Sequence, residues 1–210
     1  MSSPIWQRTL GEFVDNVASS KPVPGGGAVA ALSACLAAAL FKMLLELIVK
    51  DGANVSHKMA TVEKAMKLLQ NSVGEDITAF NSFLAARRMS KLSESERSSR
   101  SEAISSSLIY CTEVPLNALR AALSLVPIAQ ELASRTPEKA ISDCGAALAQ
   151  LDGGIVGLLF TVDINLRGTA SDPAFAKLRE ERDRLACEIA SARRDLAIAL
   201  DQVARRIGQS

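Results

Sequence analysis

A seven-residue repeat of apolar side chains between residues 55 and 89 constrains the fold of this chain more than any other feature of its sequence. One series places an apolar residue at every seventh position: Met59, Met66, Val73 and Phe80. A companion series has the same spacing with one gap: Val55, Val62, Leu69 and Phe83. Because seven residues make nearly two turns of an α-helix, the two series form one apolar seam along a single long helix. Such a seam has to pack against other helices.

Asp76 stands in the gap of the companion series, where the next apolar residue would be expected. The pattern therefore predicts a carboxylate that points toward the packed interior. Such an aspartate can be a core residue held by an ion pair, or a local rotation can turn it outward. Alternatively, loss of hydration raises its pKa and makes it available for proton transfer or for pairing with a cationic ligand.

The composition favours helices over sheets. Hydrophobic residues make up 48% of the 210 residues, but aromatic residues only 4%, and runs of β-branched residues are few. A chain of this length is enough for one domain with a sizeable core. We therefore expect residues 1–210 to form an all-α fold, a single-domain bundle of long antiparallel helices.

Turn and capping residues predict where these helices begin and end. The expected helices cover residues 5–17, 28–49, 55–89, 93–133, 136–166 and 172 onward, with bends at Pro115 and Pro127 and an interruption at Gly153-Gly154. Ser93 and Glu96 have the spacing of a capping box. Thr136-Pro137 and Asp172-Pro173 are each typical of an N-cap followed by the first helical residue.

Two of the later segments differ in how their side chains are patterned. Residues 155–166 are apolar on nearly every side except for Asp163 and Asn165, so we expect this segment at the centre of the bundle. The last helix has a long apolar stripe between Phe175 and Val203 and a charged opposite face. The stripe can pack within the domain or against a second copy of it.

Charge and cysteine usage exclude several classes of function. The chain has 24 Lys and Arg against 23 Asp and Glu, a net charge of +1, which argues against a nucleic-acid partner. The four cysteines are too dispersed for a zinc site or a disulfide framework, and no secretion signal opens the chain, so we expect a cytoplasmic protein. The apolar run Ala28–Val49 could span a bilayer, but Lys42 and Glu46 favour a buried helix and no membrane association.

Gly25-Gly26-Gly27 follows Pro22-Val23-Pro24 and opens the apolar run. Residues without side chains at a helix start let a ligand approach the backbone N–H groups, where the helix dipole favours anions. The alternative is a tight turn or a close helix crossing.

The stretch from Phe13-Val14-Asp15 through Pro22-Val23-Pro24-Gly25-Gly26-Gly27 to Leu32 resembles the opening motif of the formiminotetrahydrofolate cyclodeaminase and methenyltetrahydrofolate cyclohydrolase family. Further similar segments occur in family order and cover nearly the whole chain: Asp76 with Ala79-Phe80, Val114-Pro115-Leu116, Ser142-Asp143-Cys144-Gly145 and Val162-Asp163-Ile164-Asn165-Leu166. The resemblance implies an all-helical homodimer that acts on a tetrahydrofolate derivative without a metal or a prosthetic group.

Within that family, a stand-alone domain of this length is typically a cyclohydrolase that interconverts 5,10-methenyltetrahydrofolate and 10-formyltetrahydrofolate. The alternatives are formiminotetrahydrofolate cyclodeaminase, which releases ammonia, and a non-catalytic folate-binding or scaffold protein. Two departures from the family pattern favour the scaffold: residues 50–54 replace a basic run, and Lys139 replaces an asparagine.

The resemblance also implies roles for individual residues. Asp76 is the expected proton acceptor, with Asp143 or Asp163 as substitutes. Ser142 and Asn165 would position water or the pterin, in a site lined by the turn from Pro24 to Gly27. The glutamate carboxylates of folate would bind Lys50, Lys139 or the amides of Gly25, Gly26 and Gly27.

Overall fold

The computed structural model describes residues 5–50 and 55–208, and this part of the chain contains α-helices and short 3-10 segments but no strand. The α-helices are α1 (Leu10–Val17), α2 (Gly26–Lys50), α3 (Ser56–Arg87), α4 (Glu94–Leu123), α5 (Val126–Arg135), α6 (Ile141–Leu166) and α7 (Ala176–Gly208). The 3-10 segments are η1 (Ile5–Gln7), η2 (Glu138–Ala140) and η3 (Pro173–Phe175). The expected all-α fold is confirmed.

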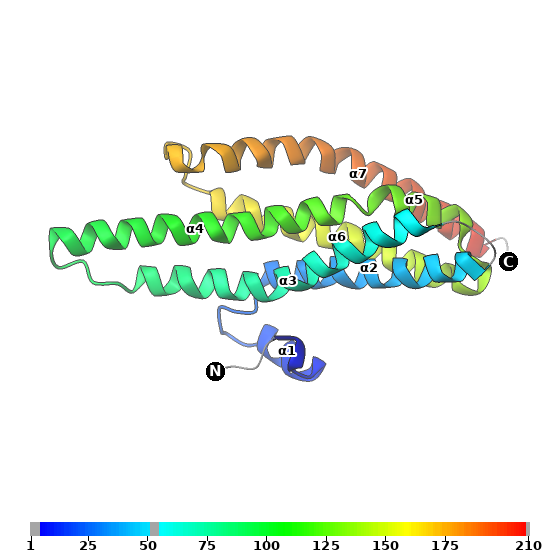
Figure 1. Cartoon of the computed structure of the whole chain (residues 1–210), viewed down its shortest axis with the longest axis horizontal. Helices are drawn as coiled ribbons and strands as arrows, with labels where there is room; N and C mark the ends of the chain where they lie inside the picture. The colour runs from blue at the N-terminus through cyan, green and yellow to red at the C-terminus, as the bar shows by residue number, and fades with distance from the viewer. Residues whose placement is uncertain (1–4, 51–54, 209–210) are drawn as a thin grey trace.

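The long helices run antiparallel to their neighbours, as Figure 1 shows. Helix α2 packs between α3 and α6, and α4 packs on both α3 and α6. Helices α3 and α4 form a hairpin that extends beyond the other helices at one end of the molecule, while α1 lies outside the bundle (Figure 1). Helix α7 covers α5 and α6.

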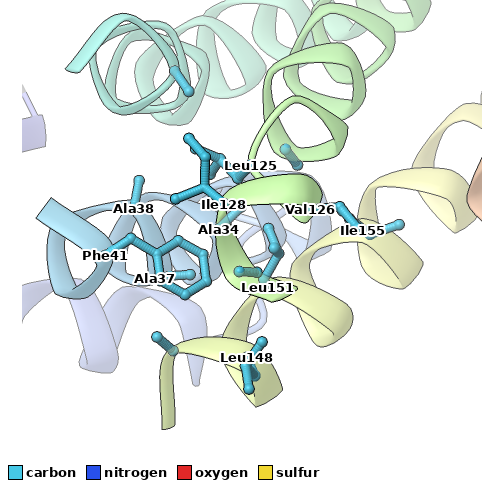
Figure 2. Close-up of a cluster of buried hydrophobic side chains, with 14 of the residues drawn as sticks. Ala34, Ala37, Ala38, Phe41, Leu125, Val126, Ile128, Leu148, Leu151 and Ile155 are labelled. Carbon is cyan, nitrogen blue, oxygen red and sulfur yellow. The ribbon is translucent and has the colours of Figure 1, made fainter. Parts of the chain in front are cut away.

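The apolar seam of α3 is confirmed as a core face. Val62 and Leu69 are fully buried, and Met59 and Met66 pack against the same core from its margin. Elsewhere the core is filled by α2, α5 and α6, whose side chains Phe41, Ile128 and Leu151 belong to one buried cluster (Figure 2). The stripe on α7 is buried within the domain, because Leu185, Leu196 and Val203 are at most 3% exposed.

Helices α2 and α6 approach each other closely through small residues. A Cβ atom on Gly154 would lie 2.9 Å from the Cβ and the backbone nitrogen of Ala34, and one on Gly157 would lie 2.7 Å from the Cβ of Ala30. The expected interruption at Gly153-Gly154 is wrong, since α6 is one continuous helix. Here glycine permits close packing of two backbones, and the buried contact outweighs its low helix propensity.

Other helix boundaries also differ from expectation. The expected helix 93–133 is two helices, because the backbone turns at Ser124-Leu125 and Pro127 lies in the first turn of α5, where its missing N–H costs no hydrogen bond. Pro115 lies inside α4, which continues past it. Thr136 ends α5 rather than capping a new α-helix, and Pro137 precedes η2.

Two caps are confirmed by their hydrogen bonds. The Ser93 backbone N–H donates to the Glu96 carboxylate at 2.8 Å, and the Glu96 N–H donates to the Ser93 hydroxyl oxygen at 3.2 Å, which is a capping box. The Asp172 carboxylate accepts from the Ala174 N–H at 2.9 Å at the start of η3.

Residues 155–166 are not at the centre of the bundle, contrary to expectation. Phe160 is 66% exposed and Ile164 is 59% exposed, whereas Ile155, Leu158 and Val162 on the opposite face are buried. The segment therefore packs on α2 and α4 with one side and leaves an apolar side open.

Two segments, Gly26–Val49 and Glu138–Leu166, are long and apolar enough to cross a membrane by length and composition alone. In the bundle, α2 buries one side of its apolar surface against α3 and α6, and the Lys42 ammonium forms an ion pair with Glu63 at 2.8 Å. These contacts are those of a core helix, as the sequence predicted for residues 28–49.

The close α2–α6 contact predicts opposite effects for alanine at two successive glycines. Gly154→Ala should lower the free energy of unfolding by about 1–3 kcal/mol, because the added methyl group overlaps Ala34. Gly153→Ala should raise it by about 0.5–1 kcal/mol, because this exposed helical position has no neighbour within 4 Å. Urea unfolding of both variants checks this, and equal stabilisation by the two substitutions would contradict the contact.

Candidate functional site

The first turn of α2 holds the carboxylate of Asp76 against its backbone. Residues 18–25 lead from α1 to α2, the Val23–Pro24 peptide bond is cis, and α2 begins at Gly26. A Cβ atom on Gly27 would lie 2.8 Å from the Asp76 Cγ and would overlap a carboxylate oxygen, whereas one on Gly26 would meet nothing within 4 Å. Only glycine at position 27 allows Asp76 to come this close to the helix.

Asp76 is partly buried and has no charged partner among the described residues. It is largely enclosed by its neighbours, and this burial raises the pKa of the carboxyl group, while a hydrogen bond from the Ala28 backbone N–H lowers it by a smaller amount. Within residues 5–50 and 55–208, no Lys, Arg or His forms an ion pair with it. Neither the ion-paired core aspartate nor the outward rotation therefore describes it.

Asp76 faces a cavity of about 470 Å³, which we call the ring cavity. Its wall combines the turn before α2 with residues of α2, α3, α4 and α6: Pro22, Val23, Gly25, Gly26, Gly27, Asp76, Phe80, Cys111, Gly157, Phe160, Thr161, Ile164 and Asn165. This volume falls within the usual range for small-molecule sites. The wall is mostly apolar, with a few polar groups at fixed positions.

Asn165 and Cys111 join α6 to α4 at this cavity. The Asn165 Nδ2 donates a hydrogen bond to the Cys111 carbonyl oxygen at 2.7 Å. Burial, with a smaller contribution from the charge of Asp76, raises the pKa of the Cys111 thiol to about 11. The thiol is therefore protonated near pH 7, which makes it a weak nucleophile. The carboxylate of Asp76 remains as the basic group in the cavity wall.

The structure brings some of the predicted site residues together. Gly25, Gly26, Gly27, Asp76 and Asn165 line the ring cavity, although they come from three different helices and the turn. Pro24 is buried beside it and lines a neighbouring cavity together with Val23.

Asp163 lies on another side of α6. Its carboxylate accepts two hydrogen bonds from the Arg182 guanidinium of α7, at 2.6 and 3.2 Å. The Asp163 carboxylate is therefore held by a cation on α7 and does not line the ring cavity. Its place in the sequence, two residues before Asn165, did not indicate this partner.

The remaining predicted residues lie at the other end of the bundle. Asp143 precedes Asn165 by 22 residues on the same helix, which is about 33 Å along its axis. Ser142 and Lys139 are exposed near Asp143. Lys50 is the last residue of α2, and its side chain, like residues 51–54, lies outside the described part of the chain.

Several residues of the ring cavity were missed as site residues in the sequence. Phe80 follows Asp76 by four positions, and Thr161 precedes Asn165 by four, so each shares a helix face with a predicted residue. That spacing could have indicated both. Cys111 has no such local signal, because only the packing of α4 on α3 and α6 places it there.

The family model for formiminotransferase-cyclodeaminase matches residues 9–184 of this chain. The chain belongs to this family. Members of the formiminotransferase-cyclodeaminase family act on derivatives of tetrahydrofolate. The matched residues include every side chain that lines the ring cavity.

Two curated relatives and one solved structure agree with this membership. The chain is 30% identical over 177 residues to a methenyltetrahydrofolate cyclohydrolase of Methylorubrum extorquens, covering 81% of this chain and 85% of that protein. It is 30% identical to a formimidoyltransferase-cyclodeaminase of Sus scrofa, covering 95% of this chain but 37% of that protein. A crystal structure of formiminotetrahydrofolate cyclodeaminase from Thermotoga maritima has the same fold, with a TM-score of 0.78 and 24% identity over 95% of this chain and 99% of that one.

The buried carboxylate predicts an unusual pH dependence of stability. Since the pKa of Asp76 in the folded state is above its ordinary value of 3.8, the folded state binds more protons than the unfolded state above that value. Stability is therefore lost as the pH rises from about 4 through the raised pKa. Asp76→Asn should remove this loss and be at least as stable as the wild type at pH 7.

Thermal unfolding of the two proteins between pH 3.5 and 7.5 measures the difference. Asp195→Asn is the control, because Asp195 is a partly exposed aspartate on α7 and does not line the ring cavity. If Asp76→Asn is less stable than the wild type by the same amount at every pH, the prediction is wrong. The contact with Ala28, and not desolvation, would then be the main contribution of Asp76 to stability.

Proposed function

We propose that this chain is a methenyltetrahydrofolate cyclohydrolase, which interconverts 5,10-methenyltetrahydrofolate and 10-formyltetrahydrofolate. The observation that carries the proposal is the carboxylate of Asp76, partly buried at the glycine turn of a mostly apolar cavity and without a cationic partner among the described residues. The relative that is named for this activity also matches over 85% of its own length.

The ring cavity suits the charge and shape of the reacting group. In methenyltetrahydrofolate the carbon to be hydrated lies between N5 and N10 in a delocalised amidinium cation. The rings of Phe80 and Phe160 offer flat apolar surfaces for the fused rings, and aromatic faces attract cations. The negative charge of Asp76 complements the cation most strongly where water is excluded.

Asp76 then acts as the proton acceptor. Water adds to the carbon between N5 and N10, and Asp76 takes one proton from it as the C–O bond forms, which leaves a neutral hydroxylated adduct. The carboxyl group returns this proton to N5 as the bond from carbon to N5 breaks. The remaining hydroxyl proton passes to solvent, and the formyl group stays on N10. A raised pKa favours this exchange, because it brings the carboxyl closer to the pH at which the enzyme works.

Other groups position the reactants. Asn165 is held by its bond to the Cys111 carbonyl and faces the cavity, where its amide can bind water or the pterin. Asp163 is paired with Arg182 and is a weaker candidate than Asp76 for the base. Asp143, Ser142 and Lys139 could join this cavity only from a second copy of the chain, since their own copy holds them at the far end of α6.

Two other functions remain as alternatives. The same cavity could serve a cyclodeaminase, in which the leaving group is an amine, and this activity is named for the relative from Sus scrofa and for the structure from Thermotoga maritima. A non-catalytic folate-binding or scaffold protein is favoured by the sequence at residues 50–54 and by Lys139.

The proposal is tested by the loss of methenyltetrahydrofolate absorbance, after subtraction of spontaneous hydrolysis. Asp76→Asn should lower kcat at least about 100-fold, as is usual for removal of a general base, without loss of the fold. Asp195→Asn should leave kcat unchanged. Full turnover by Asp76→Asn would remove Asp76 from the mechanism. Release of ammonia from formiminotetrahydrofolate would identify a cyclodeaminase, and folate binding without turnover would identify a scaffold.

We also propose a homodimer in which a second copy covers the open apolar side of α2 and α6. On α2 this side carries Val29, Leu36 and Met43 at seven-residue spacing, which are 37%, 50% and 36% exposed. On α6 it carries Phe160 and Ile164, which also line the ring cavity. A partner on this surface would therefore shield the cavity from water. The cytoplasmic location stays a prediction.

The dimer predicts that one charge on this surface separates the subunits. Leu36→Glu should shift the protein from dimer to monomer in size-exclusion chromatography with light scattering, because it buries a carboxylate in an apolar contact. Leu92→Glu is the control, since Leu92 is 89% exposed between α3 and α4. A wild-type protein that is monomeric at micromolar concentration would contradict the dimer.

A further inference from the structure

A second, larger cavity adjoins the ring cavity on the other side of residues 21–24. Its volume is about 700 Å³, and we call it the tail cavity. Its wall includes Trp6, Arg8, Lys21, Val23, Glu75 and Tyr110. Both volumes lie in the range of small-molecule sites.

The two cavities are neighbours at three points of the chain. Val23 lines both of them. On α3, Glu75 and Ile77 line the tail cavity while Asp76 between them lines the ring cavity. On α4, Tyr110 lines one and Cys111 lines the other. Asp76 lies on another face of α3 from the residues that line the tail cavity, so a ligand that occupies both cavities has to pass Val23.

The charges of the two cavities differ in sign. The ring cavity has Asp76 and no Lys or Arg in its described wall. The tail cavity has two basic side chains, Arg8 and Lys21, against one acidic side chain, Glu75. Among the described residues, neither Arg8 nor Lys21 forms an ion pair within 4.0 Å, although Arg8 is near enough to Glu12 to contribute to the lowered pKa of that carboxyl group.

Local hydrogen bonds fix the backbone that carries these basic residues. The Trp6 indole N–H donates to the Gln70 carbonyl oxygen of α3 at 2.9 Å, and Thr9 begins α1 with a capping box to Glu12, so Arg8 is anchored on both sides. The Lys21 backbone N–H donates to the Ser19 hydroxyl at 3.2 Å. An ordered backbone lowers the entropy lost when these side chains bind a ligand.

We propose that the tail cavity binds the p-aminobenzoyl-glutamate part of the folate substrate and that Arg8 and Lys21 bind its glutamate carboxylates. This inference rests on the proposed function. The substrate has a cationic ring system at one end and carboxylates at the other, and the adjoining cavities have the complementary charges. In this proposal Arg8 and Lys21 take the place of Lys139 as the residues that bind the tail. Lys139 of the same chain lies near the start of α6, whereas the ring cavity lies near the end of that helix.

A ligand without the pterin ring tests the tail cavity apart from catalysis. Isothermal titration calorimetry with p-aminobenzoyl-triglutamate should show binding to the wild type that weakens as salt is added. The double variant Arg8→Gln/Lys21→Gln should bind it about tenfold more weakly, since each exposed charge pair contributes up to about 1 kcal/mol. Glu75→Gln should bind it more tightly, because a like charge is removed from the wall.

Two further variants serve as controls. Lys177→Gln removes an exposed charge from α7 and should bind the triglutamate like the wild type. Arg167→Gln removes a basic residue from a shallow hollow formed with Phe160 and Ile164, on another side of the ring cavity. If Arg167→Gln binds p-aminobenzoyl-triglutamate more weakly while the double variant binds it normally, the tail lies in the hollow at Arg167, and the proposal is wrong.

Steady-state kinetics separate this inference from the proposed function. With methenyltetrahydrofolate, the double variant should keep the wild-type kcat and show a raised KM, by a larger factor for the triglutamate form than for the monoglutamate form. Lys21→Gln alone, at an exposed position, should show the same change to a smaller degree if the double variant folds poorly. An unchanged KM in the double variant, or no binding of p-aminobenzoyl-triglutamate to the wild type, would contradict the tail-binding proposal alone. Absence of turnover by the wild type would contradict the proposed cyclohydrolase function.

Discussion

The close packing of α2 on α6 determines where the rest of the site can lie. Gly154 and Gly157 admit Ala34 and Ala30 to distances at which no larger side chain would fit. Because the helices are antiparallel, this contact brings the first turn of α2 beside the last third of α6. The glycine turn and Asn165, far apart in sequence, thereby line one cavity. Bulkier residues at the crossing would separate the two walls, and no local change elsewhere could restore the contact.

A second close contact determines the chemistry within that cavity. Gly27 gives Asp76 a place against the start of α2, where the Ala28 N–H is the hydrogen-bond partner that offsets part of the desolvation. A partly buried carboxylate without a cationic partner destabilises the charged form of the unliganded protein. On the proposed function, the cationic substrate would offset this cost when it binds, and the cavity would favour positively charged ligands.

The periodicity of α3 was read correctly from the sequence, whereas the apolar pattern of residues 155–166 was wrongly taken to place them at the centre of the bundle, and features that depend on tertiary packing were not predicted. The seam of α3 and the burial of Asp76 follow from spacing, because position on a helix determines which side chains share a face. The expected break at Gly153-Gly154 was wrong because the low helix propensity of glycine is outweighed by a buried contact that the local sequence does not reveal. Asp163, like Asp76, stands in an apolar segment of the sequence. Its ion pair with Arg182 of α7 depends on tertiary packing, which the local sequence does not reveal.

The distribution of cations around the site explains why its acid can remain unpaired. If a lysine or arginine lined the ring cavity, it would lower the pKa of Asp76 and repel an amidinium ion. In the described wall of that cavity there is none, and the basic residues Arg8 and Lys21 lie beyond Val23. Interactions between charges weaken with distance and with exposure to water. On the proposed function, the segment of residues 21–24 therefore separates an acid that faces the cationic ring from bases that face the anionic tail. The short connection from α1 to α2 is thus as important for the site as the helices that it joins.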